Sequence, residues 1–205
     1  MDEPSDYLRR LPIGERMPLG ELAEDPLFPF EGEVHVQALQ EPILPEPQRH
    51  GVEERDCRSC NGSGDRAFVI WEDERWRLLV DPQPHGLPMV AVLMPRAHHD
   101  LDDLPPAEAA ELGPMIQRGV RAIDRLGSVG RVHVNRWGDG SFHFHVWLLA
   151  RPRGMWQMRG AMLALWDDLL PKVPAHEWEA SRRTLADTMA EGGGVTRLAS
   201  GPTTP

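Results

Sequence analysis

Two histidines stand two residues apart in the segment FHFHVWLLA, and their spacing is the first feature that suggests chemistry. Alternation with a period of two predicts a β-strand, with Phe142 and Phe144 on the face that packs against the core. His143, His145 and Trp147 then share the opposite face, with the two imidazoles about 6–7 Å apart. Two ordinary histidines on a solvated face would give the same pattern. The alternative is a strand that positions both histidines for a functional role.

The two cysteines of the chain, Cys57 and Cys60, form a C-x-x-C pair. Such a pair is too small for a disulfide framework, so it indicates half of a metal site, a redox dithiol or plain thiols. Two histidines would complete a tetrahedral Cys2His2 site. The candidates are His98 or His99, which are adjacent, together with His143.

Charge is unevenly distributed along the 205 residues, whose formal net charge is -10. Residues 1–56 carry 14 acidic and 5 basic side chains, a net of -9, which leaves 18 acidic and 17 basic ones, a net of -1, for the remainder. Neither part offers the basic surface that binding to nucleic acid needs. No apolar stretch is long enough to cross a membrane and none resembles a signal peptide, so we expect a cytoplasmic protein.

The order of the predicted elements indicates an α+β fold with an antiparallel sheet of about five strands. The strands are expected at 67–71, 76–80, 89–94, 131–137 and 142–150. A helix from Pro105 to about Leu126, with apolar residues at intervals of three or four, should pack on the sheet. We expect four parts: an acidic, proline-rich arm (1–56), a catalytic domain (57–155), a helical extension (156–191) with helices at about 155–170 and 175–190, and a disordered tail (192–205).

Six short motifs, in order along residues 57–155, together resemble the histidine triad superfamily. They are C57-R-S-C60, W71-E-D-E-R, L79-V-D81-P, P95-R-A-H98, N135-R-W-G-D-G-S and H143-F-H145-V-W147-L-L-A-R151. Each motif is weak alone, but six at plausible spacings are a specific signal. The resemblance does not extend to the arm or to the C-terminal helices.

The register of the last motif decides which histidine would be central. One register takes Ser141, His143 and His145 as the three positions, and the other takes His143, His145 and Trp147. The resemblance favours the second, because an Arg tends to follow the central His by six residues, as Arg151 follows His145. This register also leaves His143 at the position that ligates zinc in metal-bearing members.

The resemblance implies a nucleotide hydrolase or nucleotidyltransferase in which His145 attacks the phosphate and forms a covalent intermediate. Ser141 and Gly140 would contact phosphate oxygens, Asp81 the ribose, and Asn135 and Arg151 the phosphate side. Each of these residues also has an ordinary interpretation: Asp81 before a proline forms turns, and an Arg after a strand is often solvated. Cys57, Cys60, His98 and His143 would hold a structural zinc ion. A homodimer is implied as well.

Trp147 departs from the family pattern, in which the third position is His or Gln. An indole offers one N–H donor and no exchangeable base, so it cannot donate a proton as an imidazolium can. We therefore expect a preference for good leaving groups. Two other classes stay open: a nucleotide-binding protein without turnover, and a metal-dependent hydrolase whose zinc is held by the two histidines.

Overall fold

The computed structural model describes residues 7–20, 24–62 and 67–198. The chain divides into two compact units, Met1–Gln48 and Arg49–Pro205. The described part of the first unit contains a 3₁₀ helix (η1, Leu8–Arg10) and a parallel bridge between Ile13 and Leu39. All elements that the sequence motifs occupy lie in the second unit.

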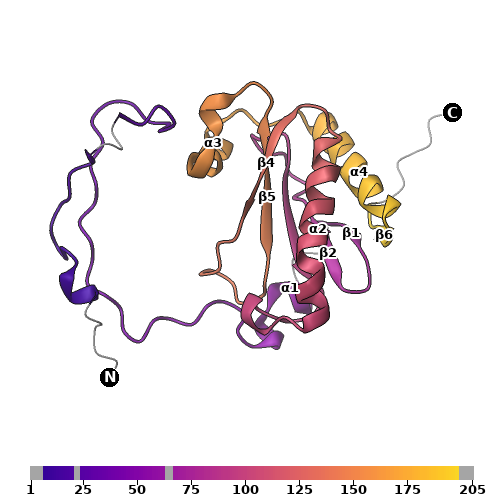
Figure 1. Ribbon diagram of the computed structural model, residues 1–205, viewed down its shortest axis with the longest axis horizontal. Coiled ribbons are helices and arrows are strands. Elements are labelled where there is room, and N and C mark those ends of the chain that lie inside the picture. Colours follow the sequence, from indigo (N-terminus) through magenta and orange to yellow (C-terminus); the bar gives the residue numbers. More distant parts are fainter. Residues whose placement is uncertain (1–6, 21–23, 63–66, 199–205) are drawn as a thin grey trace. The chain divides into compact units, whose positions relative to one another are not determined.

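A six-stranded sheet organises the second unit (Figure 1). Its strands are β1 (Val69–Glu72), β2 (Trp76–Leu79), β3 (Val90–Pro95), β4 (Val129–Asn135), β5 (Val146–Pro152) and β6 (Val195–Thr196). They lie in the order β4-β5-β3-β2-β1-β6, and every neighbouring pair is antiparallel. The predicted α+β class is confirmed, with one short strand more than expected.

Helices cover one face of this sheet. Figure 1 shows α2 (Pro106–Asp124) beside α4 (Ala175–Glu191); α2 contacts β3, β4 and β5, and α4 contacts β1 and β6. Helix α2 begins with a proline at its first turn, where a missing N–H has no consequence. A Cβ at Gly119 would lie 2.7 Å from Leu148, so this glycine lets α2 approach β5 closely.

Alternation along the central strands separates two buried layers. Ala91 and Leu93 of β3 belong to the main core under the helices. Val90, Val92 and Met94 point to the other face, where two smaller clusters lie. The remaining short elements are α1 (Arg58–Asn61), α3 (Leu163–Leu169), η3 (Glu54–Asp56), η4 (Leu101–Asp103), η5 (Trp156–Met158) and η6 (Gly160–Met162). No helix among the described residues is long and apolar enough to span a membrane.

The strand expected over 142–150 begins only at Val146. Upstream, the backbone N–H of Phe144 donates to the carbonyl of His99 at 2.7 Å, and that of Phe142 donates to His50 at 3.0 Å. Because these bonds replace ladder bonds, residues 142–145 leave the sheet. His143 and His145 therefore do not share a strand face: His143 is buried and His145 is half-buried.

Two other expectations differ from the structure. The helix expected over 155–170 is broken into η5, η6 and α3, because Gly160 adopts a φ of 72°, outside the helical region. The tail expected to be disordered from residue 192 instead forms β6, which pairs with Trp71 and Glu72 of β1. Residues 199–205 of that tail lie outside the described residues.

Candidate functional site

The four predicted metal ligands lie together. One ligand atom from each of Cys57, Cys60, His98 and His143 lies within 4.8 Å of the others. Nδ1 of His143 is 3.5 Å from Sγ of Cys57 and 3.4 Å from Sγ of Cys60, and Nδ1 of His98 is 3.3 Å from Sγ of Cys60. For zinc bonded tetrahedrally to sulfur at 2.3 Å and nitrogen at 2.0–2.1 Å, neighbouring ligands would be about 3.5 Å apart.

Backbone carbonyls orient both rings for this cluster. Nε2 of His143 donates to the carbonyl of Pro95 at 2.9 Å, and Nε2 of His98 donates to that of Val52 at 3.1 Å. A carbonyl only accepts, so each Nε2 carries the proton and each Nδ1 directs a lone pair at the thiols. His99, the alternative ligand, instead has its Nδ1 3.9 Å from a carboxylate oxygen of Asp103.

The protonation of the cluster without a cation is also consistent with a metal site. Burial and the neighbouring Cys57 raise the pKa of the Cys60 thiol to about 12. Burial lowers the pKa of His143, so this ring is neutral. A bound Zn²⁺ would deprotonate the thiols, because the thiolate is the usual ligand form. The donor set and its distances fit zinc in a closed, structural site.

Beside the cluster, a cavity of about 550 Å³ lies on the sheet face away from α2 and α4. It brings together five residues that the sequence predicted: Asp81, Gly140, Ser141, His145 and Trp147. The floor is apolar, and Leu79, Val92 and Trp147 lie in one row across β2, β3 and β5. The volume lies in the range of small-molecule sites.

His145 is fixed in one tautomer at the wall of this cavity. Its Nδ1 lies 2.9 Å from the carbonyl oxygen of His143 and must donate to it. The proton of a neutral ring therefore sits on Nδ1, and the lone pair is on Nε2. The indole of Trp147 meets the imidazole edge-on, with 6.2 Å between ring centroids.

Polar groups occupy the two ends of the cavity. The strand register places Asp81 level with Val90, and Met94 about level with His145. These levels are four residues apart, or roughly 13 Å. The Asp81 carboxylate also accepts from the N–H of Gln83 at 2.8 Å, so the turn-forming interpretation holds for it as well.

Two predicted residues lie outside the cavity lining. Asn135 is paired with Trp147 across the β4–β5 ladder. Arg151 is buried and donates to the carbonyls of Pro152 and Met155, at 3.1 and 3.0 Å. Six residues of extended chain, roughly 20 Å, separate it from His145, which is too far for a shared phosphate. The six-residue spacing between His145 and Arg151 favoured the second register, but the structure shows no contact between these two side chains.

The lining also contains two histidines and an arginine that were not predicted as site residues: His50, His85 and Arg58. His50 was assigned to the arm, yet its backbone forms a parallel bridge with Ser141. Arg58 lies between the two cysteines and was interpreted from the sequence only as a spacer residue of the C-x-x-C pair. Nδ1 of His85 lies 2.7 Å from Asp167, a residue outside the matched motifs. No local pattern in the sequence indicates these long-range contacts.

The sequence and the structure were compared with known proteins, and the matches are solved structures. No described protein family and no curated protein matches the sequence. Many of the solved structures that match are histidine triad proteins, the superfamily that the six motifs resemble. The three matches described next are 13–22% identical to this chain.

Three of these structures illustrate the extent of the match. A zinc-bound histidine triad family protein from Mycobacterium smegmatis is 22% identical, with 68% of this chain and 96% of that chain covered and a TM-score of 0.47. A Hit-like protein from Bartonella henselae is 13% identical, with 67% and 96% covered and a TM-score of 0.47. A hypothetical histidine triad nucleotide-binding protein from Sulfolobus tokodaii is 15% identical, with 60% and 84% covered and a TM-score of 0.44.

Proposed function

We propose that this protein is a nucleotide hydrolase or nucleotidyltransferase in which Nε2 of His145 is the nucleophile. One observation carries the proposal: the Nδ1–H of His145 donates to the His143 carbonyl, so the lone pair is on the other ring nitrogen, in a residue that lines the cavity. A neutral imidazole is not repelled by an anionic phosphate, and it leaves readily afterwards.

The reaction has two balanced steps. In the first, Nε2 bonds to phosphorus, the bond from phosphorus to the leaving-group oxygen breaks, and the leaving group takes up a proton. The imidazolium that forms keeps its Nδ1–H bond to the carbonyl of His143, which stabilises the positive charge. In the second, water or an acceptor hydroxyl attacks phosphorus, loses a proton and displaces His145, which becomes neutral again.

The other lining residues suit the two ends of a nucleotide. Ser141 and Gly140 offer a hydroxyl and a backbone N–H, and Arg58 offers a positive charge, at the His145 end. The apolar floor would take the base and Asp81 the ribose hydroxyls. The roughly 13 Å between the two ends is enough for a nucleoside monophosphate.

His50 is the group that we assign to protonate the leaving group. The indole N–H of Trp147 is too weak an acid to protonate a leaving group, and of the three described histidines that line the cavity, His145 is the nucleophile and His85 is bound to Asp167. The backbone of His50 is held by Gly140 and Phe142 on either side of Ser141, at 3.1 and 3.0 Å. This attachment keeps an imidazole at the phosphate end.

A structural zinc ion at Cys57, Cys60, His98 and His143 would supply no chemistry to the reacting phosphate, because four protein ligands leave no open position. This closed set disfavours a metal-dependent hydrolase. The metal would tie α1 to the segment before β5.

A homodimer, which the family resemblance implies, is a further proposal that light scattering of the purified protein tests.

Detection of a covalent adduct tests the proposed function. The zinc-loaded protein is mixed with α-labelled nucleoside triphosphates, nucleotide sugars and dinucleoside polyphosphates, quenched and digested. We expect an acid-labile nucleotidyl group on the peptide that spans 142–151, absent from His145→Ala. An adduct on His143 would make the other register right. Nucleotide binding without any adduct or turnover would favour a non-catalytic binding protein, the class that Trp147 suggests.

A further inference from the structure

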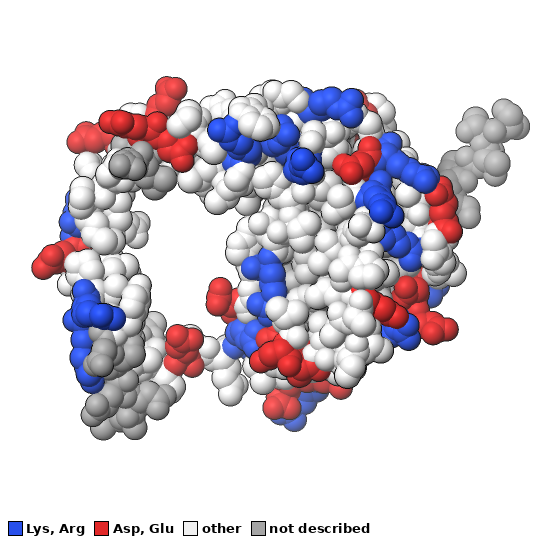
Figure 2. All heavy atoms as spheres, in the orientation of Figure 1, with Lys and Arg blue, Asp and Glu red and all other residues white. Residues whose placement is uncertain are grey.

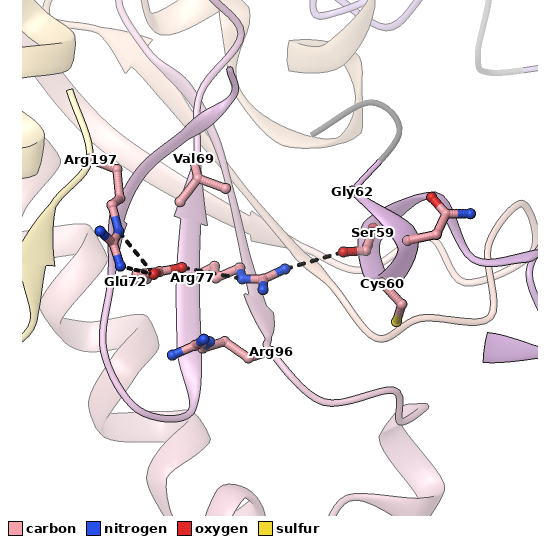
Figure 3. A pocket seen from close by; sticks show the side chains of 9 residues that line it. Ser59, Cys60, Gly62, Val69, Glu72, Arg77, Arg96 and Arg197 are labelled. Atoms are coloured by element: carbon pink, nitrogen blue, oxygen red, sulfur yellow. Dashed lines mark hydrogen bonds and ion pairs between the residues drawn. The ribbon is translucent and has the colours of Figure 1, made fainter. Parts of the chain in front are cut away.

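A second cavity, of about 460 Å³, lies at the other end of α1 and is lined by three arginines (Figure 3). Arg77 comes from β2, Arg96 follows β3 and Arg197 follows β6, so three separate strands bring their guanidinium groups to one place. The opposite wall is α1 with Ser59 and Cys60. The cavity shares only Ser59 with the lining of the His145 cavity.

The charge of this lining is not balanced. Against three guanidinium groups stands a single carboxylate among the described lining residues, that of Glu72, which gives these residues a net charge of +2. Burial alone would raise the pKa of Glu72. The hydrogen bond from Arg197 and the charges of Arg96 and Arg77 outweigh this effect and lower the pKa below its usual value, so the carboxylate is ionised. Cationic side chains thus gather here in a chain whose formal net charge is -10. On the face that Figure 2 shows, by contrast, acidic and basic side chains are interspersed over this unit.

Arg197 is ion-paired with Glu72, to which its Nε donates at 2.9 Å, whereas Arg77 and Arg96 also bind groups that carry no charge. Nη1 of Arg77 donates to the carbonyl of Ser59 at 3.2 Å, and Nη1 of Arg96 donates to that of Asp73 at 2.9 Å. Carbonyl oxygens fix the position of a guanidinium without neutralising it. Nε of Arg77 is buried without a hydrogen-bond partner, although it lies 3.4 Å from a Glu72 oxygen. Each guanidinium has five N–H donors, so several are in excess of these contacts.

We propose that this cavity is a second anion site, which binds the phosphoryl groups of a small polyphosphorylated molecule. Planar guanidinium forks match the geometry of phosphate oxygens, and three of them can contact two or more phosphoryl groups at once. The volume is in the range of sites for organic ligands, and so it leaves room for more than one phosphate. The site is independent of the His145 chemistry.

The test is calorimetric titration of the zinc-loaded full chain with inorganic tripolyphosphate. Arg96→Gln should weaken binding about tenfold or more, because a charge-assisted hydrogen bond is lost. Glu72→Gln should tighten binding severalfold, because it removes the one competing carboxylate. Arg121→Gln, at an exposed arginine on the helical face, is the matched control and should bind as the wild type does.

The opposite signs separate binding from folding, since a variant with a damaged fold would not bind more tightly. If Arg96→Gln fails to fold, the Glu72→Gln result decides. Equal affinity of the Arg96, Glu72 and control variants would overturn the proposal. So would loss of binding in Arg58→Gln alone, which would place the anion in the His145 cavity. Because the probe has no base or sugar and turnover is not measured, neither failure bears on the nucleophile.

Discussion

The carbonyl oxygen of His143 accepts the Nδ1–H of His145 at 2.9 Å, while the imidazole of the same His143 lies against Cys57 and Cys60. One residue thus belongs to both the metal cluster and the cavity wall. Its ring faces the thiols and its backbone sets the tautomer of the neighbouring imidazole. We infer that a metal at the cluster would keep this carbonyl, and therefore His145, in position.

Substitution of the two histidines should separate catalysis from stability. His145→Ala should lower kcat/KM by several orders of magnitude, because no other lining group replaces the nucleophile. Its melting temperature should stay within about 2 °C of wild type, since the half-buried ring lies at the cavity wall. His143→Ala should instead lower both metal content and melting temperature. Equal destabilisation by the two substitutions would contradict this division.

Cys57→Ser should lower the zinc content and the stability together. Loss of a buried ligand should reduce the free energy of unfolding by about 3 kcal/mol or more, which corresponds to a melting temperature roughly 6–12 °C lower. Metal analysis of protein purified without chelator should give close to one zinc per chain for the wild type. The matched control is His99→Ala, which should keep its zinc because His99 lies outside the cluster. Full stability of the wild type after chelation would argue against a structural ion.

His50→Gln should slow reactions with poor leaving groups more than reactions with good ones. An alkoxide needs a proton as it departs, whereas pyrophosphate does not, so the rate ratio between an alkyl ester and a triphosphate should fall about 100-fold. A purely structural role for His50 would slow both substrates equally. The ratio of the two kcat/KM values is therefore the quantity to measure.

Trp147→His should have the opposite effect on that ratio. An imidazole beside His145 would add a proton donor at the third position of the motif and raise the rate with poor leaving groups. The rate with good leaving groups should change little. An unaltered ratio would remove the argument that the indole limits the choice of substrate.

The pairing of His85 with Asp167 should make stability depend on pH. Burial raises the pKa of Asp167, but the hydrogen bonds from His85 and from the N–H of Leu87 lower it below its usual value. The resulting stabilisation is complete above the unfolded pKa, near 4, and is lost as the pH falls through the folded value. At pH 7, Asp167→Asn should lower stability by roughly 1–3 kcal/mol. The difference in melting temperature from wild type should shrink below about pH 4 and should not shrink above it.

The sequence predicted the α+β fold well because each long element carries its own periodic signal. The strand at β3 is a continuous apolar run, and α2 has apolar residues at helical intervals. The break at Gly160 could not be predicted, since a glycine adopts a positive φ only where the tertiary structure needs it. β6 was missed because a two-residue strand has no periodicity.

The residues of the candidate site also fall into two groups, those that the sequence predicted and those that it did not. The metal ligands are recognisable because their residue types are rare and the two cysteines are close in the sequence, and the structure brings the predicted four together. Arg58, His50 and His85 were missed because only the fold brings them to the cavity. Arg151 was predicted from a spacing along one strand, but a spacing of six residues in an extended chain separates residues by roughly 20 Å.

The strand β6 gives the C-terminal segment a protective function. Val195 and Thr196 pair with Glu72 and Trp71, so they occupy the hydrogen-bonding edge of β1. Removal of the chain after Gly192 would leave unpaired backbone groups along Ile70, Trp71 and Glu72. An uncovered apolar edge is a template for another chain, so a shortened protein should aggregate during refolding even if its metal cluster and cavity were intact.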